Sequence, residues 1–403
     1  MEVLQTDALP ALRERLRREL FDIVLPFWDA HGIDHELGGF LHCIDHNGTV
    51  LSTGKYHWFQ GRGVWLYSFL YNHFGGDARW LEIARRTKEF MLRYFPQPDG
   101  WWAQMVSREG AIVEPFAGDL YGMYFAAEGL QEYAWAARDE AALETARALL
   151  RQLWAHISRP AFGVRPQGLW MVTLLITTQM RRRWDFPEIA EMNDAALDAI
   201  VNRHFNPGIG LNVEELNFDF SLTAEGATLS AVGHSLECLW MAMHEALRRG
   251  DADLWQLCAR RARRHLDVGW DHVYGGLVTA VNVDHPCHEW PVNRPTGTGL
   301  EFRERGEYNY TKSFWSVNEV QIAAMHVWEQ TRAEWAARYF DLAQEVTDEK
   351  FSLRGRGYPL YLLFSDRRIE FQPQTRRQDN YHLPRCLAFN LLAVDRMLAG
   401  QRG

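Results

Sequence analysis

Long stretches of the chain carry apolar residues at positions i, i+3, i+4 and i+7, which is the spacing of amphipathic helices. Two clear examples cover residues 77–95 and 251–270. Strand signals are confined to short motifs in which a glycine stands among aromatic or β-prone residues. The pattern therefore predicts a mainly helical protein with only brief hairpin-like segments.

The glycine motifs recur between pairs of the predicted helices, and each interval is long enough for two helices and their connections. Six helix pairs without a Pro/Ser-rich linker or a change in composition predict a closed ring. We expect one (α/α)6 barrel of about twelve helices that spans residues 1–403 as a single domain. An open α-solenoid is the alternative, although its repeats are usually more alike than these. The marker glycines are Gly39, Gly100, Gly163, Gly210, Gly276 and Gly357.

Composition and charge narrow the class of partner. Hydrophobic residues make up 47% of the chain and charged residues 24%, which is typical of a globular protein. A net charge of -9 argues against a nucleic-acid or anionic-membrane partner, because both require clustered Lys and Arg. The five cysteines are scattered and form no CxxC pair. The longest apolar run, residues 169–176, is too short to span a bilayer. We therefore expect a cytoplasmic protein that acts on a small molecule, and the sequence leaves a homodimer open.

Four stretches combine ionisable groups with aromatic rings near predicted helix starts. In the second of them, His234, Glu237 and Trp240 are three residues apart, so a helix would place all three on one wall. Such a wall is unusual for a plain hydrophobic core. The stretches are "WFQGRGVW" (58–65), "GHSLECLW" (233–240), "KSFWSVNE" (312–319) and "YHLPRCL" (381–387).

In order and spacing these stretches resemble the N-acylglucosamine 2-epimerase family, whose members carry Q-x-R-x-x-W, G-H-x-x-E-x-x-W, K-x-x-W-x-x-x-E and H-x-P-R segments. The resemblance covers roughly nine tenths of the chain. It implies an (α/α)6 barrel and an isomerase that opens a sugar ring and inverts carbon 2 without a redox cofactor. It also implies two catalytic histidines, which fall by position on His234 and His382.

Histidine suits this chemistry, because a proton next to a carbonyl is weakly acidic and imidazole is a base whose pKa lies near neutral pH. One histidine would remove the C2 proton to leave a planar enediolate. The other would return a proton on the opposite face. The expected substrate is an N-acylhexosamine such as N-acetylglucosamine or N-acetylmannosamine, or a related aldose such as mannose or glucose.

The remaining family positions are expected to bind substrate. Arg62 would contact the open-chain oxygens and stabilise the enediolate. Glu237 and Glu319 would orient the histidines, with buried ion pairs as the alternative. Two tryptophans would stack on sugar faces. A lysine and an arginine would bind substrate or fasten one inner helix to its neighbour. These last four residues are Trp240, Trp315, Lys312 and Arg385.

The segment "DHPCHEW" (284–290) resembles a metal site at first sight. A structural zinc site usually pairs one two-ligand unit with a second, and no partner unit is evident. We therefore expect no metal and no cofactor. An activating nucleotide is left open, although no phosphate-binding glycine loop stands out.

Three other functions compete. An inverting glycoside hydrolase on the same type of barrel would use Asp119, Glu237 and Glu319. An aldose–ketose isomerase would share the enediolate, and a non-catalytic binding protein would keep only the fold. Relatives that act on cellobiose or isomerise free aldoses have a histidine in the helix corresponding to residues 168–180, and this chain has none. The loop 283–311 is also longer than usual, so the sugar stays open.

Overall fold

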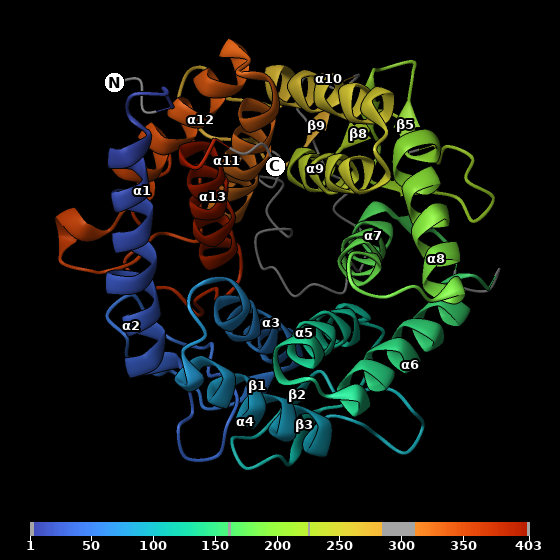
Figure 1. Cartoon of the computed structure of the whole chain (residues 1–403), viewed down its shortest axis with the longest axis vertical. Coiled ribbons are helices and arrows are strands. Elements are labelled where there is room, and N and C mark those ends of the chain that lie inside the picture. Colours follow the sequence, from blue (N-terminus) through green and yellow to red (C-terminus); the bar gives the residue numbers. More distant parts are fainter. Residues whose placement is uncertain (1–3, 160–162, 225, 284–310, 401–403) are drawn as a thin grey trace.

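The computed structural model describes residues 4–159, 163–224, 226–283 and 311–400. Within them, twelve long helices form two concentric rings (Figure 1). Six inner helices surround the axis, and each contacts the next around the closed ring. The inner helices are α3 (His57–His73), α5 (Tyr121–Ala137), α7 (Gln167–Arg181), α9 (Val232–Arg249), α11 (Phe314–Thr331) and α13 (His382–Leu398).

Each outer helix packs against one inner helix. The first outer helix is a continuous run of α1, η1, α2 and η2, in which π-helical segments alternate with α-helix. The prediction of twelve helices in one (α/α)6 barrel is confirmed. The outer helices are α1 (Leu9–Arg18) with η1 (Glu19–Val24), α2 (Leu25–Phe27) and η2 (Trp28–Gly32), then α4 (Ala78–Tyr94), α6 (Glu140–Ile157), α8 (Pro187–Asp198) with η4 (Ala199–Arg203), α10 (Ala252–Gly269), and α12 (Glu334–Val346) with η6 (Thr347–Phe351).

Burial separates the two rings as the sequence pattern predicts. Outer helix α4 buries Ala84, Thr87, Phe90 and Met91, a single stripe at helical spacing. Inner helix α5 buries every residue from 122 to 134, so it is enclosed on all sides. Asp77 begins α4 and Asp251 begins α10 as side-chain N-caps, in agreement with the ranges expected from periodicity.

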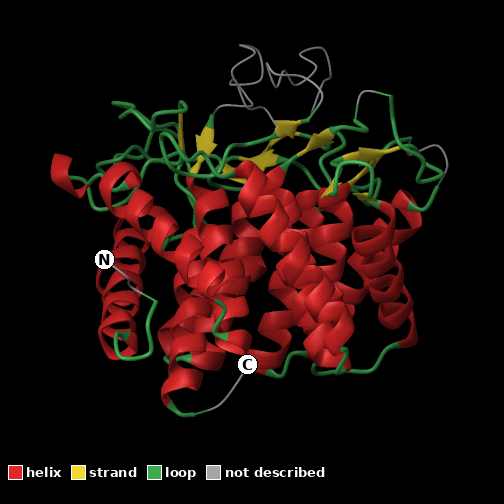
Figure 2. Ribbon diagram, turned by 90° about the horizontal axis from the view of Figure 1, so that it is seen from above, coloured by secondary structure: helices red, strands yellow, loops and turns green. Residues whose placement is uncertain are grey.

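Connections with turns and short strands join each outer helix to the next inner helix, and the strands lie at one end of the barrel (Figure 2). The six marker glycines occupy these connections, and each has a positive φ between 69° and 89°. Glycine adopts this backbone region without the steric cost that a Cβ atom brings. The strands are β1 (Lys55–Tyr56), β2 (Met105–Val106), β3 (Ile112–Glu114), β4 (Arg165–Pro166), β5 (Phe205–Asn206), β6 (Leu211–Asn212), β7 (Glu215–Leu216), β8 (Leu229–Ser230), β9 (Val281–Asn282), β10 (Lys312–Ser313) and β11 (Phe364–Ser365), with a 3₁₀ turn η7 (Arg354–Arg356).

The strands pair only in small antiparallel groups, so no extended sheet forms from the described residues. β1, β2 and β3 make a three-stranded sheet in that order, and the other pairs are β4–β7, β5–β6, β8–β9 and β10–β11. In β10–β11, Lys312 stands opposite Ser365. Each inner helix follows one of these connections, so all six inner helices begin at the same end of the barrel and point their amino termini toward it.

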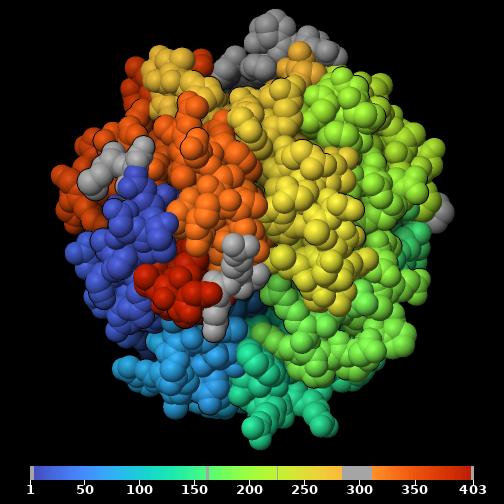
Figure 3. Space-filling view, turned by 45° about the horizontal axis from the view of Figure 1, so that its top comes forward, coloured from blue at the N-terminus to red at the C-terminus, as the bar shows by residue number. Residues whose placement is uncertain are grey.

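The beginning of the chain closes the ring. Helix α1 packs against α13, and the Arg13 side chain donates to Asp395 at 2.5 Å. Figure 3 shows the blue N-terminal segment beside the red C-terminal helix on the surface. None of the described helices has the length and apolar character needed to cross a membrane.

Candidate active site

A cavity of about 190 Å³ lies at the hairpin end of the barrel axis. All six inner helices contribute to its wall, with residues from their first three turns. The remaining wall residues are Thr279, Thr311, Ser313, Leu360, Tyr361, Leu363, Phe364, Arg377, Gln378, Asp379 and Tyr381. Inner helix amino termini surround the cavity, and their backbone dipoles place partial positive charge there. The inner-helix residues of the wall are Trp58, Phe59, Arg62, Tyr121, Phe125, Met171, Val172, Leu175, His234, Glu237, Met241, Phe314, Trp315, Asn318, His382, Leu383 and Arg385.

His382, the first residue of α13, is held by a buried carboxylate. Its Nδ1 lies 3.1 Å from Oε1 of Glu319 on α11. Burial lowers the pKa of His382 to about 3, so the imidazole is neutral at physiological pH. A neutral ring that donates from Nδ1 to the carboxylate keeps an acceptor lone pair on Nε2. His382 can therefore accept a proton from a molecule in the cavity.

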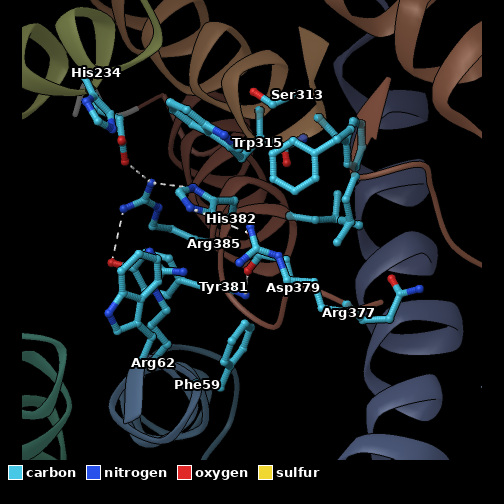
Figure 4. Close-up of a pocket in the computed structure, with 18 of the residues that line it drawn as sticks. Phe59, Arg62, His234, Ser313, Trp315, Arg377, Asp379, Tyr381, His382 and Arg385 are labelled. Carbon is cyan, nitrogen blue, oxygen red and sulfur yellow. Dashed lines mark hydrogen bonds and ion pairs between the residues drawn. The ribbon is translucent and has the colours of Figure 1, made fainter. Parts of the chain in front are cut away.

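His234 on α9 has a carboxylate partner of its own. Its Nδ1 lies 2.9 Å from Oε1 of Glu214, which precedes β7. The His234 side chain is 33% exposed, whereas that of His382 is 11% exposed. Both imidazole rings have centroids 5.5 Å from the Trp315 ring (Figure 4). Two carboxylate-held histidines thus stand next to the same indole at the cavity.

Arg385 links three inner helices beneath the histidines. Its Nη2 donates to Glu237 of α9 at 2.6 Å and to Glu319 of α11 at 2.5 Å. Burial raises the pKa of Glu319, and the adjacent Arg385 guanidinium opposes that shift. Glu237, Glu319 and His382 have the donor atoms of a metal site, but the guanidinium lies within hydrogen-bond distance of both carboxylates. This cluster is therefore arranged around an arginine.

A second layer of hydrogen bonds continues below Arg385. Its Nη1 donates to the Tyr381 hydroxyl at 3.1 Å, and that hydroxyl donates to Glu128 of α5 at 2.9 Å. Burial raises the pKa of Glu128 to about 7, while Arg385 and the Tyr381 hydroxyl oppose the shift. His382, at the start of α13, is thus supported by a buried polar network that reaches across the barrel.

Arg62 of α3 supplies positive charge on the wall opposite α9. Its guanidinium carbon is 4.0 Å from the Phe125 ring centroid and 4.7 Å from that of Tyr381. A Cβ atom added to Gly61 would come within 2.3 Å of the Phe125 backbone, so glycine is required where α3 packs on α5. This close contact fixes Arg62 against the aromatic rings.

Comparison with known proteins agrees with this arrangement. The family model of N-acylglucosamine 2-epimerase (GlcNAc 2-epimerase) matches residues 39–169. N-acylglucosamine 2-epimerase from Bos taurus is 27% identical over 95% of this chain and 91% of its own length. The Homo sapiens enzyme is 26% identical over 95% and 90%. The chain is therefore similar to the N-acylglucosamine 2-epimerase family, through the family model over residues 39–169 and through these relatives over most of its length.

The fold comparison gives the same barrel. The solved structure of cellobiose 2-epimerase from Bacillus thermoamylovorans superposes on this chain with a TM-score of 0.77. The two are 16% identical, and the match covers 96% of this chain and 100% of the other. At this identity the likeness establishes the (α/α)6 fold.

Six of the nine family positions expected at the site line the cavity, and three do not. The six are Arg62, His234, Glu237, Trp315, His382 and Arg385. Glu319 is fully buried behind His382, where it holds the imidazole and Arg385. Its expected role of orienting a histidine agrees with this position, but direct substrate contact does not.

The positions of Trp240 and Lys312 differ from the prediction that both residues contact the substrate. Both are fully buried and neither lies on the cavity wall. The Trp240 indole N–H donates to Glu319 at 2.8 Å, so this ring supports the histidine network instead of stacking on a sugar. Lys312 donates to Asp271 at 3.0 Å and to the Gly275 carbonyl. The alternative interpretation of Lys312, an internal ion pair, is the one that the geometry favours.

The Lys312 pair has a counterpart elsewhere in the barrel. In the first hairpin, the Lys55 ammonium lies 2.9 Å from Asp34 and donates to the Gly38 carbonyl. Each aspartate precedes a double glycine by four residues. The same clamp therefore secures the hairpins before α3 and before α11, the helices that carry Arg62 and Trp315.

Replacing Lys312 with Met is expected to lower the free energy of unfolding by about 3 kcal/mol, because the buried Asp271 carboxylate loses a partner. Burial lowers the pKa of Lys312 to about 8, and the Asp271 carboxylate opposes that shift. Urea denaturation followed by circular dichroism measures the loss. Arg85→Met, which removes an exposed ion pair, is the control and should change stability by less than about 1 kcal/mol. If the Lys312→Met variant had unchanged stability and a much higher KM, the result would instead favour a contact between Lys312 and the substrate.

Sequence reasoning missed several residues of the site. Glu214, Arg377 and Asp379 lie in connecting segments without a helical period, so no pattern marks them. Glu214 lies within the fourth glycine motif, four residues after Gly210, and that motif is the one signal that could have located it. Asp379 Oδ2 lies 3.8 Å from Nε2 of His382, within the segment that precedes α13.

Asp119, one of the carboxylates considered for a hydrolase, is absent from the cavity wall. It accepts from the Tyr56 hydroxyl at 2.9 Å and from the Tyr121 backbone N–H at 2.9 Å. Glu237 is paired with Arg385, and Glu319 is fully buried. The three carboxylates therefore do not form a pair facing each other across the cavity. The expected "DHPCHEW" segment and most of the loop 283–311 lie outside the described residues.

Proposed function

We propose that the protein is a sugar 2-epimerase that inverts C2 of an N-acylhexosamine, or of a related aldose such as mannose or glucose. The observation that carries the proposal is the pair of histidines, His234 and His382, each with Nδ1 held by a carboxylate and each adjacent to Trp315. Similarity to the N-acylglucosamine 2-epimerase family supports an isomerase-class carbohydrate enzyme.

In the proposed reaction the open-chain sugar lies with C2 between the two histidines. Nε2 of one histidine takes the C2 proton, and the electrons left on carbon move into the C1 carbonyl to give an enolate, which is an enediolate when C2 carries a hydroxyl group. Nε2 of the other histidine, carrying a proton, delivers it to the opposite face of C2. Carboxylates on Nδ1 favour this role, because they fix the tautomer and stabilise the imidazolium that forms.

The charge that develops on the substrate oxygens has a suitable environment. Arg62 lies on the cavity wall, and the amino termini of six helices face the same space. Cationic groups held in place before the reaction stabilise an oxyanion without reorganisation. Trp315 offers a flat apolar surface for the carbon chain. We assign Glu237, Arg385 and Glu319 to holding these groups in position.

An inverting glycoside hydrolase is less well supported, because Asp119 and Glu319 do not line the cavity. Aldose–ketose isomerisation stays the nearer alternative, since it needs the same enediolate and differs in where the proton returns. We further propose that residues 1–403 act as one cytoplasmic domain without a metal or cofactor. The homodimer and an activating nucleotide stay open predictions from the sequence.

A substrate panel in deuterium oxide tests the proposal. N-acetylglucosamine, N-acetylmannosamine, mannose, glucose and cellobiose are incubated with the protein in the presence of a chelator, and products are resolved by chromatography and mass spectrometry. We expect the C2 epimer of at least one sugar, with one deuterium at C2, and no effect of chelation, because the two histidines need no Lewis acid. Ketose accumulation would favour the isomerase, and released monosaccharide would favour the hydrolase. Activity that disappears with the chelator and returns with a divalent ion would contradict the metal-free reaction.

A further inference from the structure

Asn318 is a buried amide on the cavity wall whose polar atoms are both unpaired. The residue is 1% exposed, and neither Nδ2 nor Oδ1 has a hydrogen-bond partner in the structure as described. Buried amides in folded proteins nearly always have partners. Since Asn318 lines the cavity, the missing partner is supplied by what the cavity holds.

Its position ties Asn318 to the two histidines. Asn318 lies one turn beyond Trp315 on α11, on the same side of the helix, and Trp315 contacts both imidazole rings. The next residue, Glu319, holds Nδ1 of His382. A molecule that presents C2 to the histidines therefore brings the substituents of C2 close to Asn318.

Part of the cavity wall that Asn318 shares is apolar. Phe314 lies four residues earlier on the same helix face and stacks on Tyr361, with ring centroids 4.6 Å apart. Leu360 and Leu383 line the same cavity. We call these five residues, Phe314, Asn318, Leu360, Tyr361 and Leu383, the Asn318 wall. It offers one amide donor and one amide acceptor beside hydrocarbon.

We propose that the Asn318 wall binds the acylamino group on C2 of an N-acylhexosamine, an inference that rests on the proposed epimerase function. Oδ1 of Asn318 accepts from the substrate N–H, and Nδ2 donates to the acyl carbonyl. The acyl methyl group packs against Phe314 and Leu383. A C2 hydroxyl group has no methyl to fill this apolar surface, so an unsubstituted aldose gains less from the wall.

Asn318→Ala and Asn318→Leu test this assignment, the second being close in size to the natural side chain so that the wall stays filled. Each variant is assayed for kcat/KM in both directions with N-acetylglucosamine and N-acetylmannosamine, and in parallel with glucose and mannose. We expect a loss of about tenfold to a hundredfold for the N-acetyl sugars, as expected for two hydrogen bonds, and a change of less than about twofold for the free aldoses.

Gln321→Ala is the matched control. Gln321 is a buried amide one turn further along α11, but it donates to Gln344 and does not line the cavity. Its removal should leave the preference between the two sugar classes unchanged. Equal losses for both classes in the Asn318 variants would overturn the acylamino site and indicate a structural role. A wild-type protein that inverts mannose but not N-acetylmannosamine would also overturn it while leaving the epimerase function intact. Failure of every sugar to show C2 exchange would overturn the epimerase function itself.

Discussion

Replacing either His234 or His382 with Asn is expected to lower the rate of C2 epimerisation by roughly 10²–10⁴-fold, because each face of the planar intermediate depends on one base. Asparagine keeps the approximate size of the side chain and a hydrogen-bonding atom for Glu214 or Glu319, so the barrel should stay folded. Initial rates with the best substrate of the panel measure the effect. His35→Asn makes the same chemical change at an exposed site and should retain full activity.

Isotope exchange separates the roles of the two histidines. In deuterium oxide each single variant should still exchange the C2 proton of one epimer, because its remaining histidine removes and returns the proton on one face. His234→Asn and His382→Asn should label opposite epimers. If both variants epimerise within about tenfold of the wild-type rate, a change near 1.4 kcal/mol, then neither residue is an essential base.

Acidification from pH 7 to pH 5 is expected to remove most of the folding stability. Burial lowers the pKa of His42, His326 and His382 to about 3, and that of His204 and His265 to about 4. In the unfolded chain these histidines regain the ordinary pKa of about 6.5, so below that pH the unfolded state binds more protons.

The expected loss is large because the histidines act together. Each one contributes roughly 2 kcal/mol at pH 5, so five contribute roughly 10 kcal/mol, which is comparable to the total stability of a typical domain. Urea denaturation at half-unit steps of pH measures the slope, which should appear between pH 6.5 and 5, well above the range where paired carboxylates titrate. His265→Gln should reduce the slope by about one proton. Stability that stays level across this interval would show that the five histidines are not buried in the neutral form.

The fold could be predicted because its signals are local and repeated. The stripes in residues 77–95 and 251–270 became α4 and α10, and the six glycines that mark the connections all adopt positive φ. A closed ring of helix pairs is the arrangement that lets each pair bury its apolar faces against two neighbours. The same repetition does not encode which polar side chains reach the axis.

The site could be predicted only as far as its residues lie in short motifs at helix starts. The histidines of α9 and α13 were located in this way, and so were Arg62 and Arg385. A motif does not show the direction of each side chain, so buried Trp240 and Lys312 were expected to contact substrate. The carboxylate partner of His234 was missed because Glu214 lies 20 residues away in a connection. Only the folded structure brings such distant groups together.

Closure of the ring by the first outer helix has a consequence for synthesis of the chain. The helix run from Leu9 to Gly32 packs against α13, and Arg13 reaches Asp395 across 382 positions of sequence. At a translation rate of roughly 5–20 residues per second, about 20–70 seconds separate the emergence of these two helices from the ribosome. During that time the apolar stripe of Leu9, Leu12 and Leu16 has no native partner. The helix that finally covers this stripe also carries His382, so a nascent chain places this cavity residue in the same event that ends the exposure of the stripe to aggregation and chaperone binding.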